Sequence, residues 1–337
     1  MDYYLGLDVG GTKTFCLVGD SDGTIKGFGR SGAGSYEVDG VAPALVQNRL
    51  AIDQALHTAG LTLSDIKGIG MGVAGADLPE DYAMLEREIY TPLFGDIPRM
   101  FRNDSMGGLR AGTRYPMGIV IACGTGCVCA GRNRQGDEDR VGGFGPRFGD
   151  ECSGEDLGLL GLRRVWQARD KVIPPTLLTQ KFVEKGGCAD LEEFFLKYYR
   201  SEITVDDLQP MAKLVFDAAL EGDEASQAIL VEGGKYLAAM VIACARKLTM
   251  VEDEFEVVMA GSVFNGSSPV LRDTMTEYIH KVCPKARPVI SPFVPVVGAL
   301  LMGMELQGVE VTEPVYENLT EQLVQAEKKY AVKFTSA

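Results

Sequence analysis

The clearest pattern along the chain is a pair of apolar runs separated by a short glycine-rich turn, and it occurs twice. Residues 5–18 place the polar group from Asp8 to Lys13 between two apolar stretches. Residues 117–131 repeat this arrangement around Gly124-Thr125-Gly126. Apolar runs that flank a glycine turn are typical of β-hairpins with buried strands. Two such hairpins, one early and one near the middle, predict a duplicated architecture in which each half offers one turn to a shared ligand.

Strand and helix patterns alternate along the rest of the chain, which predicts an α/β protein. Strands are expected at residues 24–29, 66–73, 99–103 and 254–259, and helices at 41–59, 82–90, 105–113, 224–247, 269–281, 294–306 and 316–330. Residues 135–139 are interpreted as a polar turn and residues 174–219 as several short helices. At about 150 residues per domain, the length of 337 residues predicts two domains.

The composition narrows the classes of ligand. The net charge of -14 disfavours nucleic acid and anionic membranes as partners, so an anion such as ATP would need local amides, cations and a metal ion. Only two histidines are present, outside the glycine-rich motifs, so Ser-His or Cys-His nucleophilic chemistry is not expected. The first strand begins almost at residue 1, no uninterrupted apolar run reaches membrane-spanning length, and the eight cysteines are scattered. We therefore expect a cytoplasmic protein with reduced thiols.

The first glycine turn has the composition of a phosphate-binding loop. Gly10 and Gly11 carry no Cβ atom and can adopt positive φ, so a ligand can approach the backbone amides. Thr12 adds a hydroxyl group, Lys13 adds a cation, and Asp8 is placed to hold a metal ion or its water. The spacing is not that of a P-loop, and no helix follows directly as in a dinucleotide-binding motif. Taken alone, the turn could equally be an ordinary tight hairpin.

Two aspartates occupy positions suited to chemistry. Asp104 stands at the end of a predicted strand, before a helix that contains the unusual pair Gly107 and Gly108. Glycine in a helix costs about 1 kcal/mol relative to alanine, so the pair indicates close packing or a ligand against the backbone. Asp150 ends a glycine-rich loop. Each aspartate has a simpler alternative role, because Asp104 can cap the following helix and Asp150 can support a turn.

Cys123, Cys127 and Cys129 lie on the second hairpin, where a metal or iron–sulfur site is one interpretation. Neighbouring side chains in a strand point to opposite faces, which favours simple packing in a buried hairpin. The sequence leaves open whether these cysteines have a role beyond packing.

A series of motifs, taken in order, resembles the N-acetylglucosamine kinase branch of the BadF/BadG/BcrA/BcrD ATPase family, within the actin, sugar kinase and Hsp70 superfold. The motifs are residues 8–12 (DVGGT), 72–77 (GVAGAD), 103–104 (ND), 124–126 (GTG), 142–145 (GGFG), 149–151 (GDE), 260–263 (AGSV) and 295–299 (PVVGA). The resemblance implies two actin-like (ribonuclease H-like) domains with an interdomain cleft. The first would comprise residues 1–114 plus 295–337, with the final helices packed back on it, and the second residues 115–294.

The resemblance also implies an ATP-dependent kinase that uses Mg²⁺ and phosphorylates an alcohol group of N-acetylglucosamine or a related amino sugar. Asp104 would be the base that faces the sugar hydroxyl group, and Asp8 would serve the magnesium ion. The other residues expected at ATP are Gly10, Gly11, Thr12, Lys13, Gly124, Thr125, Gly126, Ala219, Gly261 and Ser262. The residues expected at the sugar are Asp77, Asp104, Gly143, Phe144, Gly145 and Asp150.

The chain departs from the family pattern in two loops, which leaves the sugar and the phosphorylated hydroxyl group open. Residues 32–36 read GAGSY where the family carries a sugar-binding asparagine, and the second glycine turn continues into Cys127 and Val128 instead of polar residues. The alternative function is a BadF-type ATPase that activates a partner enzyme without a sugar acceptor, although the CAAGTG context of its bridging cluster is not present. We expect a homodimer that acts on a small molecule, with neither nucleic acid nor membrane as a partner.

Overall fold

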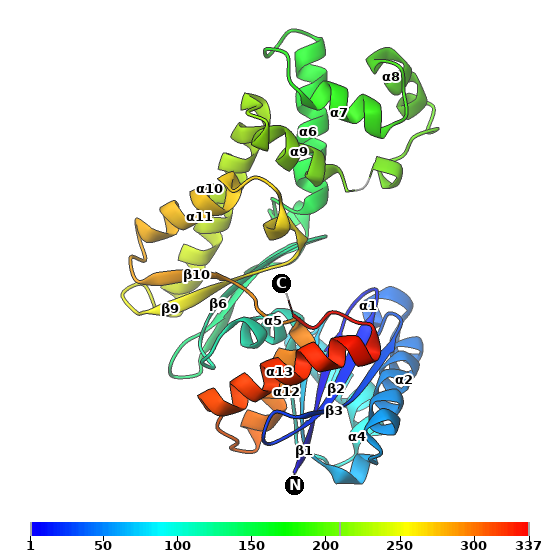
Figure 1. The fold of residues 1–337 in the computed structure, drawn as a ribbon, viewed down its shortest axis with the longest axis vertical. Coiled ribbons are helices and arrows are strands. Elements are labelled where there is room, and N and C mark those ends of the chain that lie inside the picture. The colour runs from blue at the N-terminus through cyan, green and yellow to red at the C-terminus, as the bar shows by residue number, and fades with distance from the viewer. Residues whose placement is uncertain (1, 209, 336–337) are drawn as a thin grey trace. The chain divides into compact units, whose positions relative to one another are not determined.

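The computed structural model describes residues 2–208 and 210–335, and the chain divides into two compact units (Figure 1). Unit 1 comprises residues 1–120 and 289–337, and unit 2 comprises residues 121–288. The structure contains two five-stranded sheets, one for each unit.

The sheet of unit 1 has the strand order β3-β2-β1-β4-β5. Its strands are β1 (Tyr3–Val9), β2 (Thr14–Asp20), β3 (Ile25–Ser31), β4 (Ile66–Val73) and β5 (Arg99–Asn103). β1 pairs antiparallel with β2 and parallel with β4, and β4 pairs parallel with β5. Because parallel strands end at the same edge of a sheet, the segments that follow β1, β4 and β5 lie next to one another. This edge carries Asp8, Asp77 and Asp104.

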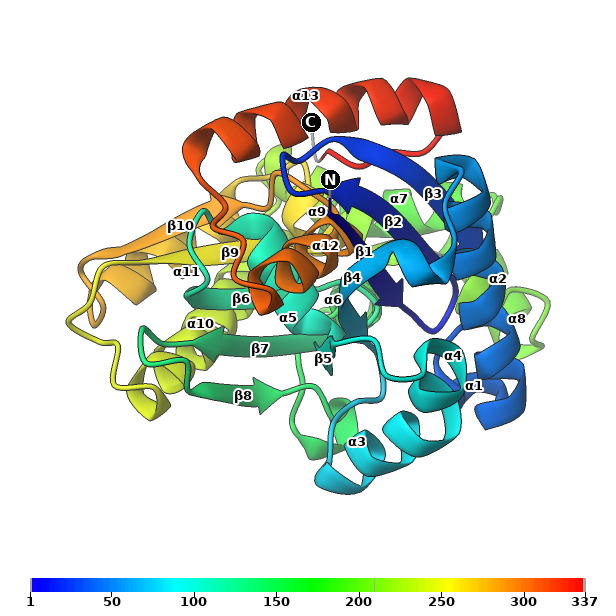
Figure 2. The ribbon, with the colours of Figure 1, turned by 90° about the horizontal axis from the view of Figure 1, so that it is seen from below.

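Helices cover both faces of this sheet (Figure 2). They are α1 (Tyr36–Asp39), α2 (Val41–Ala59), α3 (Pro79–Leu85), α4 (Thr91–Phe94), α5 (Asp104–Gly112), α12 (Pro295–Leu306) and α13 (Glu313–Tyr330), with a π-helical turn at Glu86–Tyr90. Leu5 and Leu7 belong to the core beneath α2, whereas Tyr4 belongs to the core beneath α12 and α13. Since strand side chains alternate between faces, Asp8 lies on the face of Tyr4.

Glycines allow α12 to approach the sheet and α5 closely. A Cβ atom on Gly6 would lie 2.3 Å from the nitrogen of Leu300, and one on Gly298 would lie 2.0 Å from the oxygen of Gly107. Both distances are far below van der Waals contact, so only glycine fits at these positions. Gly107, the first glycine of the pair in α5, therefore lies where α12 packs against the backbone of α5.

We expect Gly298→Ala to lower the free energy of unfolding by roughly 1–3 kcal/mol, because the new methyl group must push α12 away from α5. Equilibrium unfolding in urea measures this loss. Leu306→Ala, at the partly exposed end of the same helix, is the control and should cost less. Equal stability of Gly298→Ala and the unaltered protein would contradict this packing.

The sheet of unit 2 has the strand order β10-β9-β6-β7-β8. Its strands are β6 (Gly118–Cys123), β7 (Cys127–Arg132), β8 (Glu138–Gly142), β9 (Phe255–Ala260) and β10 (Ala286–Ile290). Its helices are α6 (Gly154–Arg169), α7 (Leu178–Lys185), α8 (Leu191–Tyr199), α9 (Met211–Leu220), α10 (Glu224–Lys247) and α11 (Val270–His280). The sequence analysis missed β8 and β10 and interpreted residues 135–139 as a turn. Both are edge strands with exposed polar residues, so they lack the apolar runs that mark central strands.

α10 is long and apolar enough to cross a membrane by length and composition, which differs from the expectation that no such segment exists. Half of its apolar window is buried inside the structure, where α10 packs against α9 and α11. Buried core helices can be equally long and apolar, so α10 is explained as a core helix of unit 2.

Candidate functional site

The turn between β1 and β2 presents backbone amides to solvent. The amide of Gly10 donates to the oxygen of Lys13 at 3.0 Å and closes the turn, while Gly11, Thr12 and Lys13 are exposed. Within the described residues, the amides of these three exposed residues have no backbone acceptor. Neither Gly10 nor Gly11 adopts a positive φ, so the expected left-handed conformation is absent. Glycine fits at position 10 because a Cβ atom there would lie 2.9 Å from the oxygen of Lys13. Exposed amides that converge on one turn suit an anion.

Asp8 and Asp104 are neighbours at the strand edge of unit 1. Asp8 in β1 pairs with Gly72 in β4, and a Cβ atom on Gly72 would lie 3.4 Å from the Cα atom of Asp104. Burial and the negative charge of Asp104 raise the pKa of Asp8 from 3.8 to about 7, and the cation of Lys13 offsets part of this rise. Two carboxyl groups held this close favour a cation between or beside them.

Asn103, and not Asp104, caps α5. The Oδ1 atom of Asn103 accepts hydrogen bonds from the amide of Ser105 at 3.1 Å and from its hydroxyl group at 2.6 Å. The Nδ2 atom of Asn103 donates to Oδ1 of Asp77 at 2.8 Å. The interpretation of Asp104 as a helix cap is therefore wrong, because Asp104 is the first residue inside the helix. The same cap ties Asp77 to the residue that precedes Asp104.

Glu37 belongs to the same acidic edge, although the sequence analysis did not single it out. Partial burial, followed by the charges of Asp77, Asp81 and Asp104, raises the pKa of Glu37. Ser35 holds this segment by accepting a hydrogen bond from the amide of Glu37 at 3.3 Å. A helix of only four residues leaves no periodic pattern, so the sequence offered no signal for Glu37.

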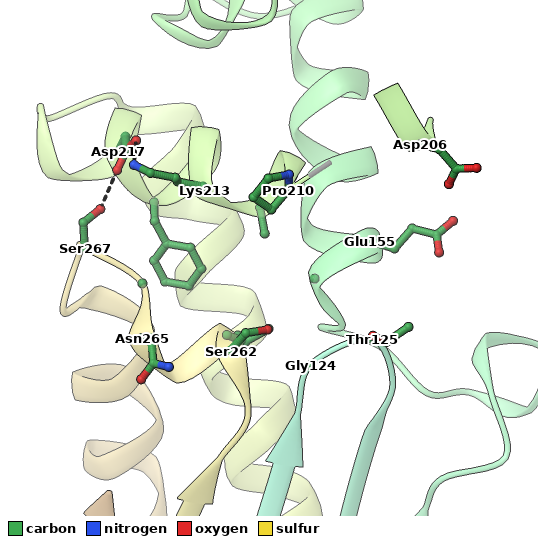
Figure 3. A pocket seen from close by; sticks show the side chains of 15 residues that line it. Gly124, Thr125, Glu155, Asp206, Pro210, Lys213, Asp217, Ser262, Asn265 and Ser267 are labelled. Atoms are coloured by element: carbon green, nitrogen blue, oxygen red, sulfur yellow. Dashed lines mark hydrogen bonds and ion pairs between the residues drawn. The ribbon is translucent and has the colours of Figure 1, made fainter. Parts of the chain in front are cut away.

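Unit 2 contains a pocket of about 630 Å³ that starts at the turn between β6 and β7 (Figure 3). The amide of Gly124 donates to the oxygen of Gly126 at 2.9 Å and closes this turn. The oxygen of Gly124 accepts from the amide of Gly154 at 2.8 Å, which joins the turn to the start of α6. Three residues expected at ATP line the pocket: Gly124, Thr125 and Ser262. The volume lies in the range of small-molecule and cofactor sites.

The far wall of this pocket comes from α9, of which the sequence analysis expected only Ala219 at ATP. Phe216 and Asp217 line it, and Asp217 accepts hydrogen bonds from Nζ of Lys213 at 2.5 Å and from Oγ of Ser267 at 2.8 Å (Figure 3). α9 has no glycine-rich motif and reads as one of several short amphipathic helices. The polar residues of α9 become part of a pocket because the segment after β9, which carries Ser267, lies against the helix.

Three other residues of unit 2 that are expected at ATP, Gly126, Ala219 and Gly261, are not among those that line the pocket. Ala219 is buried in the last turn of α9. Gly261 has a φ of +98° and a Cβ atom there would lie 2.2 Å from the oxygen of Cys123, so the fold itself requires this glycine. Gly126 differs, because its φ is not left-handed and a Cβ atom would meet nothing within 4 Å. The contacts of the fold do not require glycine at position 126. A ligand that sits against the backbone of the turn would require it, because a side chain would occupy the same space.

The loop after β8 is organised by Asp150. Its carboxylate accepts hydrogen bonds from the amide of Gly143 at 3.0 Å and from the amide of Gly145 at 2.5 Å. Phe144 lies exposed between these two anchors, with the guanidinium group of Arg140 4.3 Å from its ring centroid. The turn-supporting role of Asp150 is thus observed, and contact of this loop with a sugar stays a prediction.

The eight cysteines are free thiols. Hydrogen bonds with Cys127 and Cys152, together with burial, raise the pKa of the Cys123 thiol, and burial raises that of Cys129. Among the described residues, no group of three or more histidine, cysteine, aspartate or glutamate side chains could hold a metal ion. A divalent cation on the described residues would therefore need further ligands from a substrate.

Comparisons with known proteins identify the family of this chain. The sequence profile of the BadF/BadG/BcrA/BcrD ATPase family matches residues 5–303. N-acetyl-D-glucosamine kinase from Dictyostelium discoideum is 30% identical over 314 residues, which cover 90% of this chain and 98% of the relative. N-acetylmuramic acid/N-acetylglucosamine kinase from Clostridium acetobutylicum is 30% identical over 291 residues, which cover 85% of this chain and 93% of the relative.

A solved structure from Chromobacterium violaceum, described as a candidate N-acetylglucosamine kinase, has the same fold. Its TM-score is 0.66 at 25% identity, and the match covers 90% of this chain and 99% of that one. The likeness confirms the predicted actin-like α/β fold of the sugar kinases, with its two five-stranded sheets. The chain belongs to the BadF/BadG/BcrA/BcrD ATPase family.

Proposed function

We propose that this protein is an ATP-dependent sugar kinase that phosphorylates N-acetylglucosamine or a related amino sugar. The observation that carries the proposal is the placement of Asp104 beside Asp8, across Gly72, in a chain that is 30% identical to N-acetylglucosamine kinases over most of its length. Asn103 supplies the cap of α5, so the helix does not need the carboxylate of Asp104 for that role.

In the proposed reaction, the γ-phosphoryl group of ATP passes to a sugar hydroxyl group and ADP leaves. Asp104 orients that hydroxyl group and accepts its proton as the new P–O bond forms. The exposed amides of Gly11, Thr12 and Lys13 in unit 1 hold phosphate oxygens, and Thr125 and Ser262 serve the nucleotide in unit 2. Asp77, joined to Asn103, and the loop anchored by Asp150 are the proposed contacts to the sugar.

Asp8 is the proposed residue for Mg²⁺. Its carboxyl group is partly buried beside a second carboxyl group, and a divalent cation would relieve the repulsion between them. Mg²⁺ is usually held by one or two carboxylates together with substrate phosphates, which fits a site that lacks a dense ligand cluster. When bound, the ion neutralises charge on the phosphate groups.

An assay of ADP release across a panel of sugars tests the proposal. We expect an amino sugar to raise the rate of ADP release at least about tenfold over the rate without sugar. Slow release that no sugar changes would contradict a sugar kinase and favour an ATPase that serves a partner protein.

We expect Gly126→Val to keep the fold but to weaken Mg-ATP binding at least about tenfold, equivalent to about 1.4 kcal/mol. The fold has room for the side chain, which would occupy the space above the turn. Calorimetry measures the affinity, and the thermal unfolding midpoint reports the fold. Gly261→Ala is the contrasting variant, because its clash with Cys123 should lower that midpoint. Undiminished affinity of Gly126→Val would rule out this turn as a phosphate site.

A further inference from the structure

A buried amide, Asn48 in α2, lies behind the glycine turn of unit 1 and has no part in the proposed chemistry. Its exposed fraction is 0%, which is uncommon for asparagine. Its Nδ2 atom donates to the oxygen of Gly34 at 3.0 Å and to the oxygen of Ala44 at 2.7 Å. Two carbonyl neighbours fix the orientation of the amide group, since only its nitrogen can donate.

Asn48 is a costly choice for stability alone. Its Oδ1 atom is buried and has no hydrogen-bond partner within the described residues. An unsatisfied buried acceptor opposes folding, and its neighbours in the core of α2 are apolar, such as Ala51 and Ile52. The helix therefore keeps a polar group whose oxygen is unsatisfied and whose nitrogen binds Gly34, a residue outside the helix.

Gly34 links Asn48 to the glycine turn. The amides of Gly34 and Ser35 both donate to the oxygen of Gly10, at 3.1 and 3.3 Å, while the oxygen of Gly34 accepts from Asn48. A Cβ atom on Gly34 would lie 2.2 Å from Oγ1 of Thr14, so this segment lies directly against the start of β2. The segment is held between α2 and the turn, and Asn48 binds Gly34 from the helix.

Gly10 is the fixed point of the turn that presents the exposed amides. Its nitrogen donates to the oxygen of Lys13, and its own oxygen accepts the two amides from residues 34 and 35. If that segment shifts, the peptide of Gly10 must follow, and the direction of the next amides changes with it. Binding groups work only when a supporting shell holds them in the productive geometry.

We propose that Asn48 is a positioning residue for nucleotide binding, which acts through Gly34 and Gly10 on the amides of the turn. The inference rests on the proposed function, because it takes the ligand of the turn to be the phosphate groups of ATP. Asn48 itself touches no substrate in this arrangement.

Calorimetry with Mg-ATP on the full chain tests the proposal through Asn48→Leu, which keeps the branching of the side chain and removes the donor. We expect the Kd for Mg-ATP to rise at least about fivefold, equivalent to about 1 kcal/mol. A merely structural role would lower the fraction of protein that binds and leave Kd unchanged. Two control variants in α2 should stay within about twofold: Leu56→Ala, which loosens the core, and Gln54→Ala, which removes a hydrogen bond to the amide of Arg30.

Hydrogen exchange on the unaltered protein gives a second test that does not depend on the folding of a variant. Mg-ATP should slow exchange at the amides of Gly34 and Ser35, because both bond to Gly10. Unchanged exchange there in the nucleotide-bound protein would overturn the inference, and so would an unchanged Kd of Asn48→Leu or an equal loss in Leu56→Ala. If the unaltered protein binds no Mg-ATP, the proposed function fails and the inference fails with it.

Discussion

Asp104→Asn is expected to lower kcat by roughly 10²–10⁴ with the best amino sugar, while folding and the affinity for ATP stay nearly unchanged. Phosphoryl transfer depends mainly on positioning and charge stabilisation, and a carboxylate near the acceptor contributes to both and takes the proton. Asparagine keeps the shape of aspartate but cannot accept that proton. Steady-state kinetics, with calorimetry for ATP, separate the two effects.

The capping of α5 makes this test sharper. Because the side chain of Asn103 caps the helix, Asp104→Asn leaves the cap in place, and Asn103→Ala serves as the variant that removes it. We expect Asn103→Ala to lose about 1 kcal/mol of stability, as helix caps usually do. Near-normal turnover by Asp104→Asn would remove Asp104 from the mechanism and direct attention to Asp77 and Asp150.

Asp8→Asn is expected to have opposite effects on stability and activity. The variant loses the proposed magnesium ligand, so kcat should fall by at least about 10²-fold, since a metal ion contributes several kcal/mol to the transition state. In the absence of nucleotide the same variant should be more stable at pH 8 than the unaltered protein, by about 1 kcal/mol or more, because it removes a carboxylate that burial and Asp104 disfavour.

The sign of the pH effect follows from the raised pKa of Asp8. Between about pH 4 and pH 7, the folded protein holds a proton on Asp8 that the unfolded chain has already lost. The free energy of unfolding therefore falls as the pH rises through this window, and Asp8→Asn should flatten the fall. Urea unfolding at pH 5 and pH 8, without Mg-ATP, measures the difference. A variant that is less stable than the unaltered protein at pH 8 would contradict the electrostatic explanation.

Local patterns predicted the central strands well. The central strand β4 begins and ends at the expected residues, because a buried parallel strand needs an apolar run, and the edge strand β5 also matches its expected bounds. The likeness to family members confirms the fold that the ordered motifs implied. The roles of individual residues at ATP and at the sugar stay predictions.

What the sequence could not supply depends on contacts between distant segments. Asparagine and aspartate are equally good caps, and the choice of Asn103 over Asp104 is coupled to Asp77, 26 residues earlier. Asp217 acquires its second hydrogen bond from Ser267, 50 residues later, so no local pattern marks Asp217 as part of a site. The edge strands β8 and β10 carry polar residues and lack apolar runs, so neither was expected as a strand, and the start of β8 was interpreted as a turn.

Phosphorus-31 NMR of the complete reaction, with Mg-ATP and N-acetylglucosamine, tests the central claim most directly because it identifies the phosphoryl acceptor. We expect a sugar phosphomonoester to appear in step with ADP, in equal amount, with little inorganic phosphate. Inorganic phosphate equal to the ADP formed, without any sugar phosphate from N-acetylglucosamine or other amino sugars, would contradict the assignment of this protein as an amino-sugar kinase.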